Sequence, residues 1–386
     1  MPIHFGWYGT RGKGGFVHED FVAMQNTAID VVVSYGFGPT KCDFKTKVEK
    51  FIKNTIGFTG IKLIPEFLPK ALDDVREGDN SALNCIYDHF KDNSGIWGYL
   101  IEEPNFWCHN WPSNTIDIVR NKFNLTNQDI VVDVRPAGGR DPSKPTKKPH
   151  ESADQSTVNG LANVADVISS FWYPNPGRNW SKINGIAAVP SLSNPAPQVL
   201  YYLSNHTGSA PFWYTVDVKA NTNVAESSKA IIKWQVHMAI VKGAEGILFY
   251  SYYFASTTAR NDVKCICKEI KNCVVHDAFA TESLPSKVQK LDGNNVVYAF
   301  REYCGDFWLL VVDGSPKDNT GNPINFTFKC NLGRGYKNFQ YIRDMYNAPT
   351  TNVSPVLDPG GNWKQFSGTL TQGQVRMYRI FIGASC

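Results

Sequence analysis

Eight short apolar segments recur over the first two thirds of the chain, and each is followed by a loop and then by a stretch that can form a helix. Strands that are apolar on both faces are typical of parallel sheets covered by helices. Eight strand–helix units over about 250 residues predict a (β/α)8 TIM barrel. The predicted strands are residues 4–9, 29–36, 61–67, 96–101, 129–135, 167–173, 212–218 and 246–253.

The clearest helix lies between the last two of these strands. Residues 225–242 carry apolar side chains at the spacing of one helix face, and Gly243 is expected to end the helix. That ending places residues 246–253 as the strand that closes the barrel.

The pattern changes after a cysteine-rich helical segment at residues 263–274. Short strands now alternate with Gly, Asn, Asp and Pro, which predicts an antiparallel β-sandwich. We predict a barrel domain over residues 1–280 and a sandwich domain over residues 281–386, packed together because no long linker separates them. The best sandwich strands are residues 288–291, 296–302, 307–313, 324–329, 341–344 and 374–382.

Charge and hydropathy exclude several kinds of partner. The formal net charge of +4 is small and dispersed over the chain, whereas a nucleic-acid-binding protein concentrates basic residues on one face. No apolar run approaches the roughly 20 residues that a membrane-spanning helix needs. We therefore expect neither a nucleic-acid partner nor a membrane span.

Sequons and cysteines together favour a secreted glycoprotein with disulfide bonds. No signal peptide is visible, so we expect a processed or trimmed form. Nine cysteines leave at least one thiol unpaired, and Cys386 is the expected one. Cys265 and Cys267, followed by Cys273, lack a matching His/Cys set, so disulfides are favoured over a metal site. The sequons are at Asn124, Asn179, Asn205, Asn325 and Asn352.

A barrel brings the carboxyl ends of its strands to one face, and many polar and aromatic residues of this chain fall there. Five carboxylates with one evident arginine would cost stability, so function is the better explanation. The structural alternative is that these acids cap helices or pair with basic side chains. The residues are Tyr8, Tyr35, Glu66, Glu102, Glu103, Asp133, Arg135, Tyr173, Asp217, Tyr250 and Tyr252.

The fourth predicted strand ends in two adjacent carboxylates, Glu102 and Glu103, followed by Pro104. Mutual repulsion and lost hydration raise the pKa of at least one such carboxyl, as a general acid requires. Glycoside hydrolysis needs two carboxylates on opposite sides of a sugar bond, and aromatic rings can hold the sugar. The predicted barrel face offers both.

Glu102-Glu103-Pro104 resembles the Asn-Glu-Pro signature of the clan-A retaining glycoside hydrolases, whose Glu is the acid/base. The predicted sandwich is similar to the C-terminal β domain of many of these enzymes. The resemblance implies that Glu103 is the acid/base. Two residues depart from the family pattern: Glu102 replaces the Asn, and the seventh strand offers Asp217 in place of the nucleophilic Glu. The acidic pair also resembles the Asp-Glu pair of substrate-assisted hexosaminidases, and both schemes stay open.

We therefore predict a secreted glycoside hydrolase without cofactor or metal. A metal-dependent hydrolase is disfavoured because His4, His109 and His237 form no ligand pair. The alternative is a non-catalytic extracellular protein that binds carbohydrate or assembles outside the cell, which the missing Glu and the odd cysteine count permit. The sequence sets neither the sugar nor the oligomeric state. The candidate catalytic residues are Glu103, Asp217 and Glu102, and the candidate substrate-binding residues are Tyr8, Glu66, Trp107, Asp133, Arg135, Tyr173, Tyr250 and Tyr252.

Overall fold

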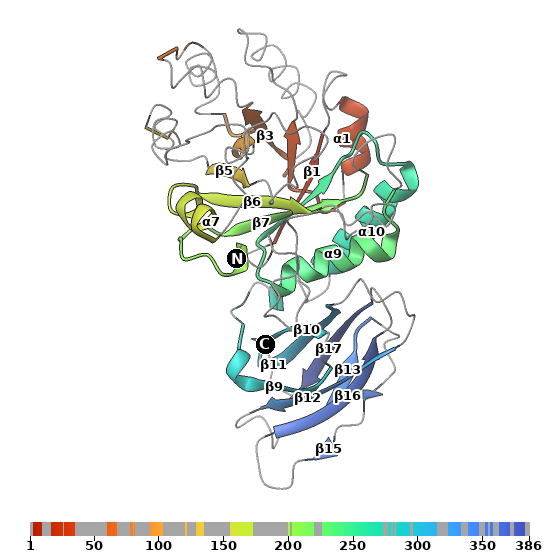
Figure 1. Ribbon diagram of the computed structural model, residues 1–386. Coiled ribbons are helices and arrows are strands. Elements are labelled where there is room, and N and C mark those ends of the chain that lie inside the picture. Colours follow the sequence, from red (N-terminus) through yellow and green to blue (C-terminus); the bar gives the residue numbers. More distant parts are fainter. Residues whose placement is uncertain are drawn as a thin grey trace, which may run out of the picture.

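The computed structural model describes both predicted parts of the chain (Figure 1). The described residues are 3–9, 17–25, 27–34, 60–67, 78–79, 81, 93–102, 120–121, 129–134, 155–172, 200, 203–219, 226–272, 277–278, 281, 283–293, 296–314, 323–332, 339–346, 352–353, 356–357, 363–370 and 374–382.

Eight parallel strands form a closed barrel in the order of the sequence, which confirms the predicted fold. Each predicted strand overlaps one observed strand, with ends that differ by a few residues. The strands are β1 (His4–Tyr8), β2 (Val31–Ser34), β3 (Lys62–Phe67), β4 (Gly98–Glu102), β5 (Asp129–Val134), β6 (Val167–Trp172), β7 (Phe212–Asp217) and β8 (Gly246–Tyr250).

The strands are apolar on both faces because each face meets a different core. Inward side chains such as Val33, Leu100 and Leu248 fill the barrel interior. Outward side chains such as Val132 and Phe249 pack in the layer between the barrel and its helices. This two-sided burial explains why the strands read as continuous apolar runs.

The helices of the described region lie outside the barrel (Figure 1). The Ser228 hydroxyl caps the start of α9 by accepting a hydrogen bond from the Ile231 N–H, 3.4 Å away. Gly243 follows the helix with a φ of 93°, which confirms the predicted end. The bounds are α1 (His18–Met24), α7 (Gln155–Ala162), α9 (Lys229–Val241) and α10 (Thr257–Asn272).

Two antiparallel sheets follow the barrel and confirm the predicted sandwich. One sheet has the order β10-β11-β17-β13-β14 and the other the order β15-β16-β12-β9. The bounds are η2 (Pro285–Lys287), β9 (Val288–Asp292), β10 (Val296–Tyr303), β11 (Asp306–Asp313), β12 (Ile324–Asn331), β13 (Tyr341–Asp344), β14 (Asn352–Val353), β15 (Val356–Leu357), β16 (Trp363–Leu370) and β17 (Val375–Phe381).

Three of these strands were not predicted, namely β14, β15 and β16. The first two have two residues each, which is too short for a periodic pattern. Strand β16 contains Lys, Gln, Ser and Gly, which obscure its alternation, although Lys364, Phe366 and Leu370 are buried. The ammonium of the buried Lys364 lies over the Phe339 ring, 4.7 Å from the centroid.

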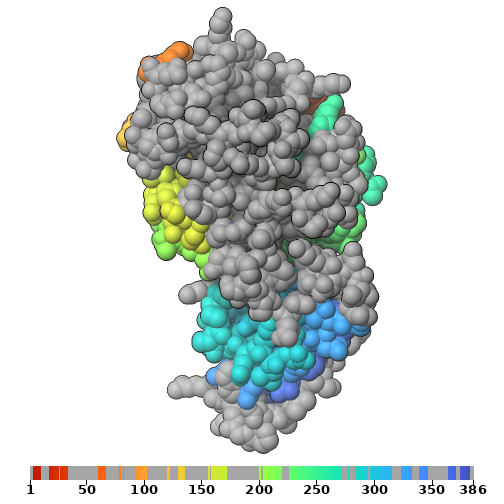
Figure 2. Space-filling view, viewed as in Figure 1, coloured from red at the N-terminus to blue at the C-terminus, as the bar shows by residue number. Residues whose placement is uncertain are grey.

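The barrel and the sandwich lie at opposite ends of the molecule, with α9 between them (Figures 1 and 2). One hydrophobic cluster runs through both, because Trp308, Leu310 and Met377 of the sandwich pack in the same core as the barrel helices. The indole N–H of Trp234 on α9 also donates to the Asp313 carbonyl, 2.7 Å away. The expected packing of the two parts is thus observed, while the boundary at residue 280 stays a prediction.

Candidate active site

The register of the barrel brings three acids to its interior, near the carboxyl ends of the strands. Asp217 of β7 pairs with Tyr250 of β8, and Tyr250 pairs with Tyr8 of β1. Glu66 of β3 pairs with Leu100, which is itself an interior residue. Asp133 occupies the interior position two residues after Val131. The five predicted residues Tyr8, Glu66, Asp133, Asp217 and Tyr250 therefore share one face of the closed sheet.

These polar residues are deeply buried. Glu66 has no exposed surface, and Asp133 and Asp217 are 4% and 1% exposed. The Tyr8 hydroxyl donates to Oε1 of Glu66 at 3.4 Å. The Tyr8 ring meets the Tyr250 ring edge to face, with 5.7 Å between centroids. The Tyr8 ring thus lies directly beside the buried Glu66, and the Tyr250 ring lies next to it.

Two buried hydroxyls extend the polar interior. Ser169 of β6 pairs with Asp133, and Thr215 of β7 lies one interior position before Asp217. Neither hydroxyl makes a hydrogen bond within the described part of the chain. Ser169, beside Ser170, and Thr215 are polar residues in otherwise apolar strands, which is the signal that could have identified them from sequence.

Gln235 of α9 holds the backbone of Asp217 in place, and the sequence analysis did not identify it. The Asp217 N–H donates to Oε1 of Gln235 at 3.1 Å, and Nε2 of Gln235 donates to the Asp217 carbonyl at 3.2 Å. The Gln235 side chain is 1% exposed. The only sequence signal is an amide within the apolar part of the helix. This clamp fixes the end of β7, where the Asp217 side chain begins.

Asp217 also affects the pKa of Tyr214, on the outer face of β7. Burial, and in addition the Asp217 carboxylate, raise the pKa of Tyr214 well above its usual value. Tyr214 therefore stays a neutral phenol in the layer between strands and helices, where it packs with the apolar core.

Tyr252 was predicted to bind substrate, but the structure places it in the core outside the barrel interior. Its ring packs in the outer core, edge to face with Trp7 at 5.2 Å, and the Arg260 guanidinium lies 3.9 Å from its centroid. Strand β8 ends at Tyr250 and a turn follows, so the alternation that would carry Tyr252 inward stops before it. Tyr252 supports the rim of the barrel and does not join the interior acids.

The other predicted site residues fall partly outside the described residues. The backbone of Glu102 ends β4 and pairs with Asp133, at an interior position. Glu103, Trp107, Arg135 and Tyr173 lie outside the described residues, as does Tyr35. Of the predicted catalytic pair, Glu103 and Asp217, the described residues include only Asp217.

The predicted disulfides of Cys265 and Cys267 are not observed. Cys265 and Cys267 are free thiols on α10, and Cys330 is a free, buried thiol on β12. Residues two apart on a helix point about 200° away from each other, so this pair cannot bond. Burial raises the pKa of the Cys267 and Cys330 thiols. Cys304 is disulfide-bonded, whereas Cys386 lies outside the described residues.

Two sequons carry exposed asparagines, Asn205 before β7 and Asn325 on β12. Asn352 belongs to β14, and Asn124 and Asn179 lie outside the described residues.

The described helices include none that is long and apolar enough to cross a membrane. The described residues also contain no group of three His, Cys, Asp or Glu side chains that could hold a metal ion.

A closed parallel barrel with buried acids at its carboxyl end, followed by an antiparallel sandwich, has the architecture of the TIM-barrel glycosidases. No protein-family model and no curated protein sequence matches this chain. Solved structures match it in fold. A maltogenic α-amylase, AmyB, of Thermotoga neapolitana aligns with a TM-score of 0.58 at 7% identity, over 98% of this chain and 99% of that enzyme.

Two further structures align over both parts of the chain. A family 5 glycoside hydrolase of Bacteroides vulgatus has a TM-score of 0.51 at 8% identity, over 98% of this chain and 89% of that one. AbfB, a family 51 α-L-arabinofuranosidase of Bifidobacterium longum, has a TM-score of 0.50 at 9% identity, over 99% and 98% of the two chains. At these identities the likeness shows the fold alone.

Proposed function

We propose that this protein is a glycoside hydrolase that cleaves O-glycosidic bonds of an oligo- or polysaccharide at the carboxyl end of its barrel. The observation that carries the proposal is the set of buried acids Glu66, Asp133 and Asp217 on the interior face, beside Tyr8 and Tyr250. Burying several acids is costly, and a purely structural barrel would fill these positions with aliphatic side chains. Carboxylates beside aromatic rings are the groups that glycoside cleavage uses.

The proposed roles follow from strand position. Glu103, directly after β4, is the proposed acid/base that protonates the leaving oxygen. Asp217 ends β7, three strands from β4 around the closed barrel, and its interior position supports it as the second carboxylate. Glu66, Asp133 and Glu102 are the reserves, and all three occupy interior positions of their strands.

The distance between the two carboxylates would decide the stereochemical outcome. Carboxyl groups about 5–5.5 Å apart allow a covalent, retaining route, and about 6.5–9.5 Å leaves room for a water and gives inversion. Aspartate is one methylene shorter than glutamate, which widens the gap. The substrate-assisted scheme needs no second nucleophile from the protein, since the acetamido group of the sugar fills that role.

The test is sugar release from a panel of polysaccharides and aryl glycosides. We expect Glu103→Gln to lower turnover by about 10²–10⁴-fold, the usual effect of removing a general acid/base, with an unchanged melting temperature. Asp217→Asn should cause a loss of similar size. Asp262→Asn on α10 is the control, because its carboxylate pairs with Lys229 on the outside of the barrel. Full activity of the Glu103→Gln variant would refute the assignment.

A non-catalytic carbohydrate-binding protein is the second candidate, and β7 favours it because its sequence Phe212–Asp217 contains no Glu. The non-catalytic alternative is supported if the wild-type protein binds an oligosaccharide but releases no sugar. In that case Asp217→Asn and Glu103→Gln should change the affinity for the oligosaccharide.

We also propose that the protein is secreted and glycosylated. The exposed side chains of Asn205 and Asn325 are accessible for glycan attachment. Mass analysis of the protein from a eukaryotic source should find glycan at one of these two positions. Native protein that is both fully reduced and unglycosylated would refute this localisation.

A further inference from the structure

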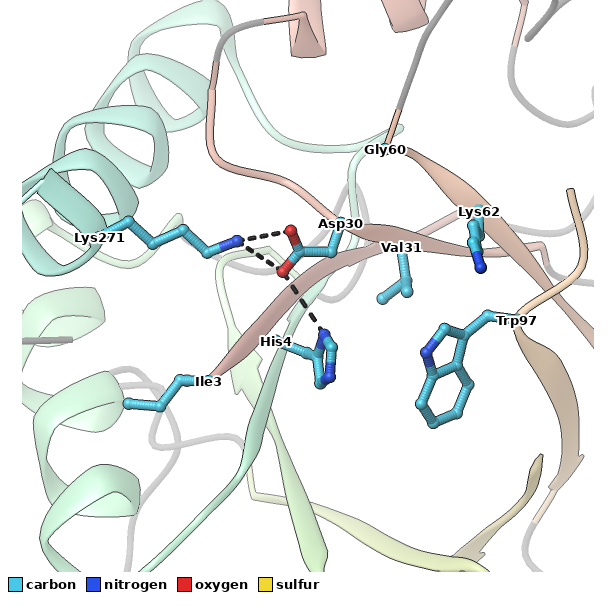
Figure 3. Close-up of a pocket in the computed structure, with 8 residues that line it drawn as sticks. All are labelled: Ile3, His4, Asp30, Val31, Gly60, Lys62, Trp97 and Lys271. Atoms are coloured by element: carbon cyan, nitrogen blue, oxygen red, sulfur yellow. Dashed lines mark hydrogen bonds and ion pairs between the residues drawn. The ribbon is translucent and has the colours of Figure 1, made fainter. Parts of the chain in front are cut away.

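A pocket lies at the opposite end of the barrel from the candidate active site. It has a volume of about 380 Å³. Its residues come from the starts of the first strands and from the last turn of α10 (Figure 3). None of them was identified as a site residue from sequence. The lining consists of Ile3, His4, Asp30, Val31, Gly60, Lys62, Trp97 and Lys271.

The wall of this pocket is aromatic. The ring centroids of Trp97 and Trp213 are 4.7 Å apart. The His4 ring centroid lies 5.9 Å from that of Trp97 and 5.7 Å from that of Trp213. Trp213 is buried inside the barrel, whereas Trp97 keeps part of its surface exposed. Gly246 leaves the space for Trp213, since a Cβ there would overlap the indole. The pocket therefore offers part of the Trp97 ring on a rigid support.

One side of the pocket is already neutralised. Nζ of Lys271 lies 2.5 Å and 2.6 Å from the two carboxylate oxygens of Asp30. Oδ2 of Asp30 also accepts from the Phe5 N–H at 3.1 Å and lies 3.7 Å from Nδ1 of His4. The carboxylates of Asp129 and Glu245 interact electrostatically with His4 as well. Lys271 is therefore already paired with Asp30, so this side offers no free cation to an added anion.

The other side holds an unpaired cation. Figure 3 shows Lys62 and Trp97 together across the pocket from Asp30 and Lys271. Lys62 forms no ion pair within the described part of the chain, and its side chain is exposed. An ammonium beside an indole ring can bind a negative charge while the ring covers an apolar plane.

We propose that this pocket binds a small planar anion of the aromatic carboxylate class. The ring of the ligand packs against Trp97, and its carboxylate pairs with the Lys62 ammonium. Small-molecule sites have volumes of roughly 300–1,000 Å³, and the volume of this pocket falls in that range. Its lining combines apolar surface with the charged or titratable side chains of His4, Asp30, Lys62 and Lys271. The site is independent of the proposed hydrolase activity, because it uses none of the residues assigned to it.

The test is calorimetric titration with 2-naphthoate, with its neutral amide as the matched ligand. We expect saturable binding to the wild-type protein and at least tenfold weaker binding of the amide. Lys62→Met and Trp97→Leu should each weaken naphthoate binding at least tenfold. Lys264→Met, a partly exposed lysine of α10 outside the pocket, is the control and should bind as the wild type does. Asp217→Asn should also leave the affinity unchanged.

Several outcomes would overturn the proposal. They are no saturable binding of naphthoate to folded wild-type protein, equal affinity for naphthoate and its amide, or unchanged affinity in Lys62→Met. Tighter binding of maltose than of naphthoate at this site, lost in Trp97→Leu, would make it a sugar site instead. Thermal melting of each variant separates loss of binding from loss of folding, and Lys62→Met is expected to fold because Lys62 is exposed.

Discussion

His237 on α9 is a buried residue that contributes a pH-dependent term to stability. Its Nδ1 lies 2.7 Å from the Lys233 carbonyl oxygen and its Nε2 lies 2.6 Å from the Tyr346 hydroxyl. Because a carbonyl only accepts, Nδ1 donates to it and Nε2 accepts from Tyr346. Burial, with a smaller contribution from the Lys233 charge, lowers the pKa of His237 to about 3, although the hydrogen bond to the Lys233 carbonyl opposes this. Folded His237 is therefore neutral above that pH.

The first prediction concerns this residue. Between pH 6.5 and about 3 the unfolded chain protonates His237 and the folded chain does not. Stability should therefore fall on acidification, with a slope of up to about 1.4 kcal/mol per pH unit from this group. His237→Gln should remove that slope, measured by urea unfolding across the window. Tyr346→Phe should lower stability by about 0.5–1.5 kcal/mol and keep the slope. An equal slope in His237→Gln and the wild type would contradict the assignment.

The second prediction compares two glycines. A Cβ at Gly246 would overlap the Trp213 ring, whereas a Cβ at Gly160 on α7 meets nothing within 4 Å. Gly246→Ala should lower the free energy of unfolding by about 1–3 kcal/mol because the barrel is overpacked there. Gly160→Ala should raise it by about 0.5–1 kcal/mol, since alanine favours the helix. Chemical denaturation of both variants provides the measurement, and a destabilised Gly160→Ala would contradict the account.

Among the helices, α9 connects the two parts of the molecule with the candidate site. Gln235 contacts β7, while Trp234 and His237 contact the sandwich at Asp313 and Tyr346. The charge of Lys233 also lies over the Tyr346 ring, 4.0 Å from its centroid. The helix is thus buried on two sides, which explains its unusually apolar composition.

The third prediction tests the clamp between α9 and β7. Gln235→Leu keeps the approximate volume but removes both hydrogen bonds from Gln235 to the buried backbone of Asp217, which should cost about 1–3 kcal/mol of stability. If Asp217 is the second carboxylate, kcat should fall more than KM changes. Gln289→Leu on the exposed face of β9 is the control and should stay within about 0.5 kcal/mol of the wild type. An unchanged kcat in a folded Gln235→Leu variant would remove Gln235 as a positioning residue.

At the scale of the whole molecule, the shared core makes the barrel and the sandwich depend on each other. Trp308 of β11 is 1% exposed and packs in the cluster that contains the barrel helices. Val297, Leu310 and Met377 add to the same contact from three strands of one sheet. Separating the two parts would expose this apolar surface to water.

The fourth prediction follows from this dependence. Calorimetry should record one cooperative transition for the whole chain. Trp308→Ala should lower the free energy of unfolding by about 3–5 kcal/mol, the usual cost of removing a buried tryptophan. Residues 1–280 alone should fail to fold stably. Two separate transitions in the wild type, or a stable isolated barrel, would show that the parts are independent.

The sequence predicted the elements better than it predicted the residues at their ends. All eight barrel strands were recognised because burial on both faces leaves a long apolar run, which sequence displays directly. Tyr252 was misplaced because a turn after Tyr250 ends the alternation, and a turn of this kind has no apolar pattern. Cys265 and Cys267 were expected to form disulfides from composition and compartment, but both are free thiols, because a disulfide needs a second thiol within reach in the fold.

The sequence by itself determined the barrel, the sandwich and the set of acids at the strand ends, because local burial periodicity and strand order fix these features. Only the tertiary structure decided which polar groups meet across the fold. Gln235 reaches Asp217 from a helix, Tyr346 reaches His237 from the other domain, and Lys271 reaches Asp30 from 241 residues away. Such contacts depend on how packed elements are oriented in space, and no pattern of neighbouring residues along the chain records that orientation.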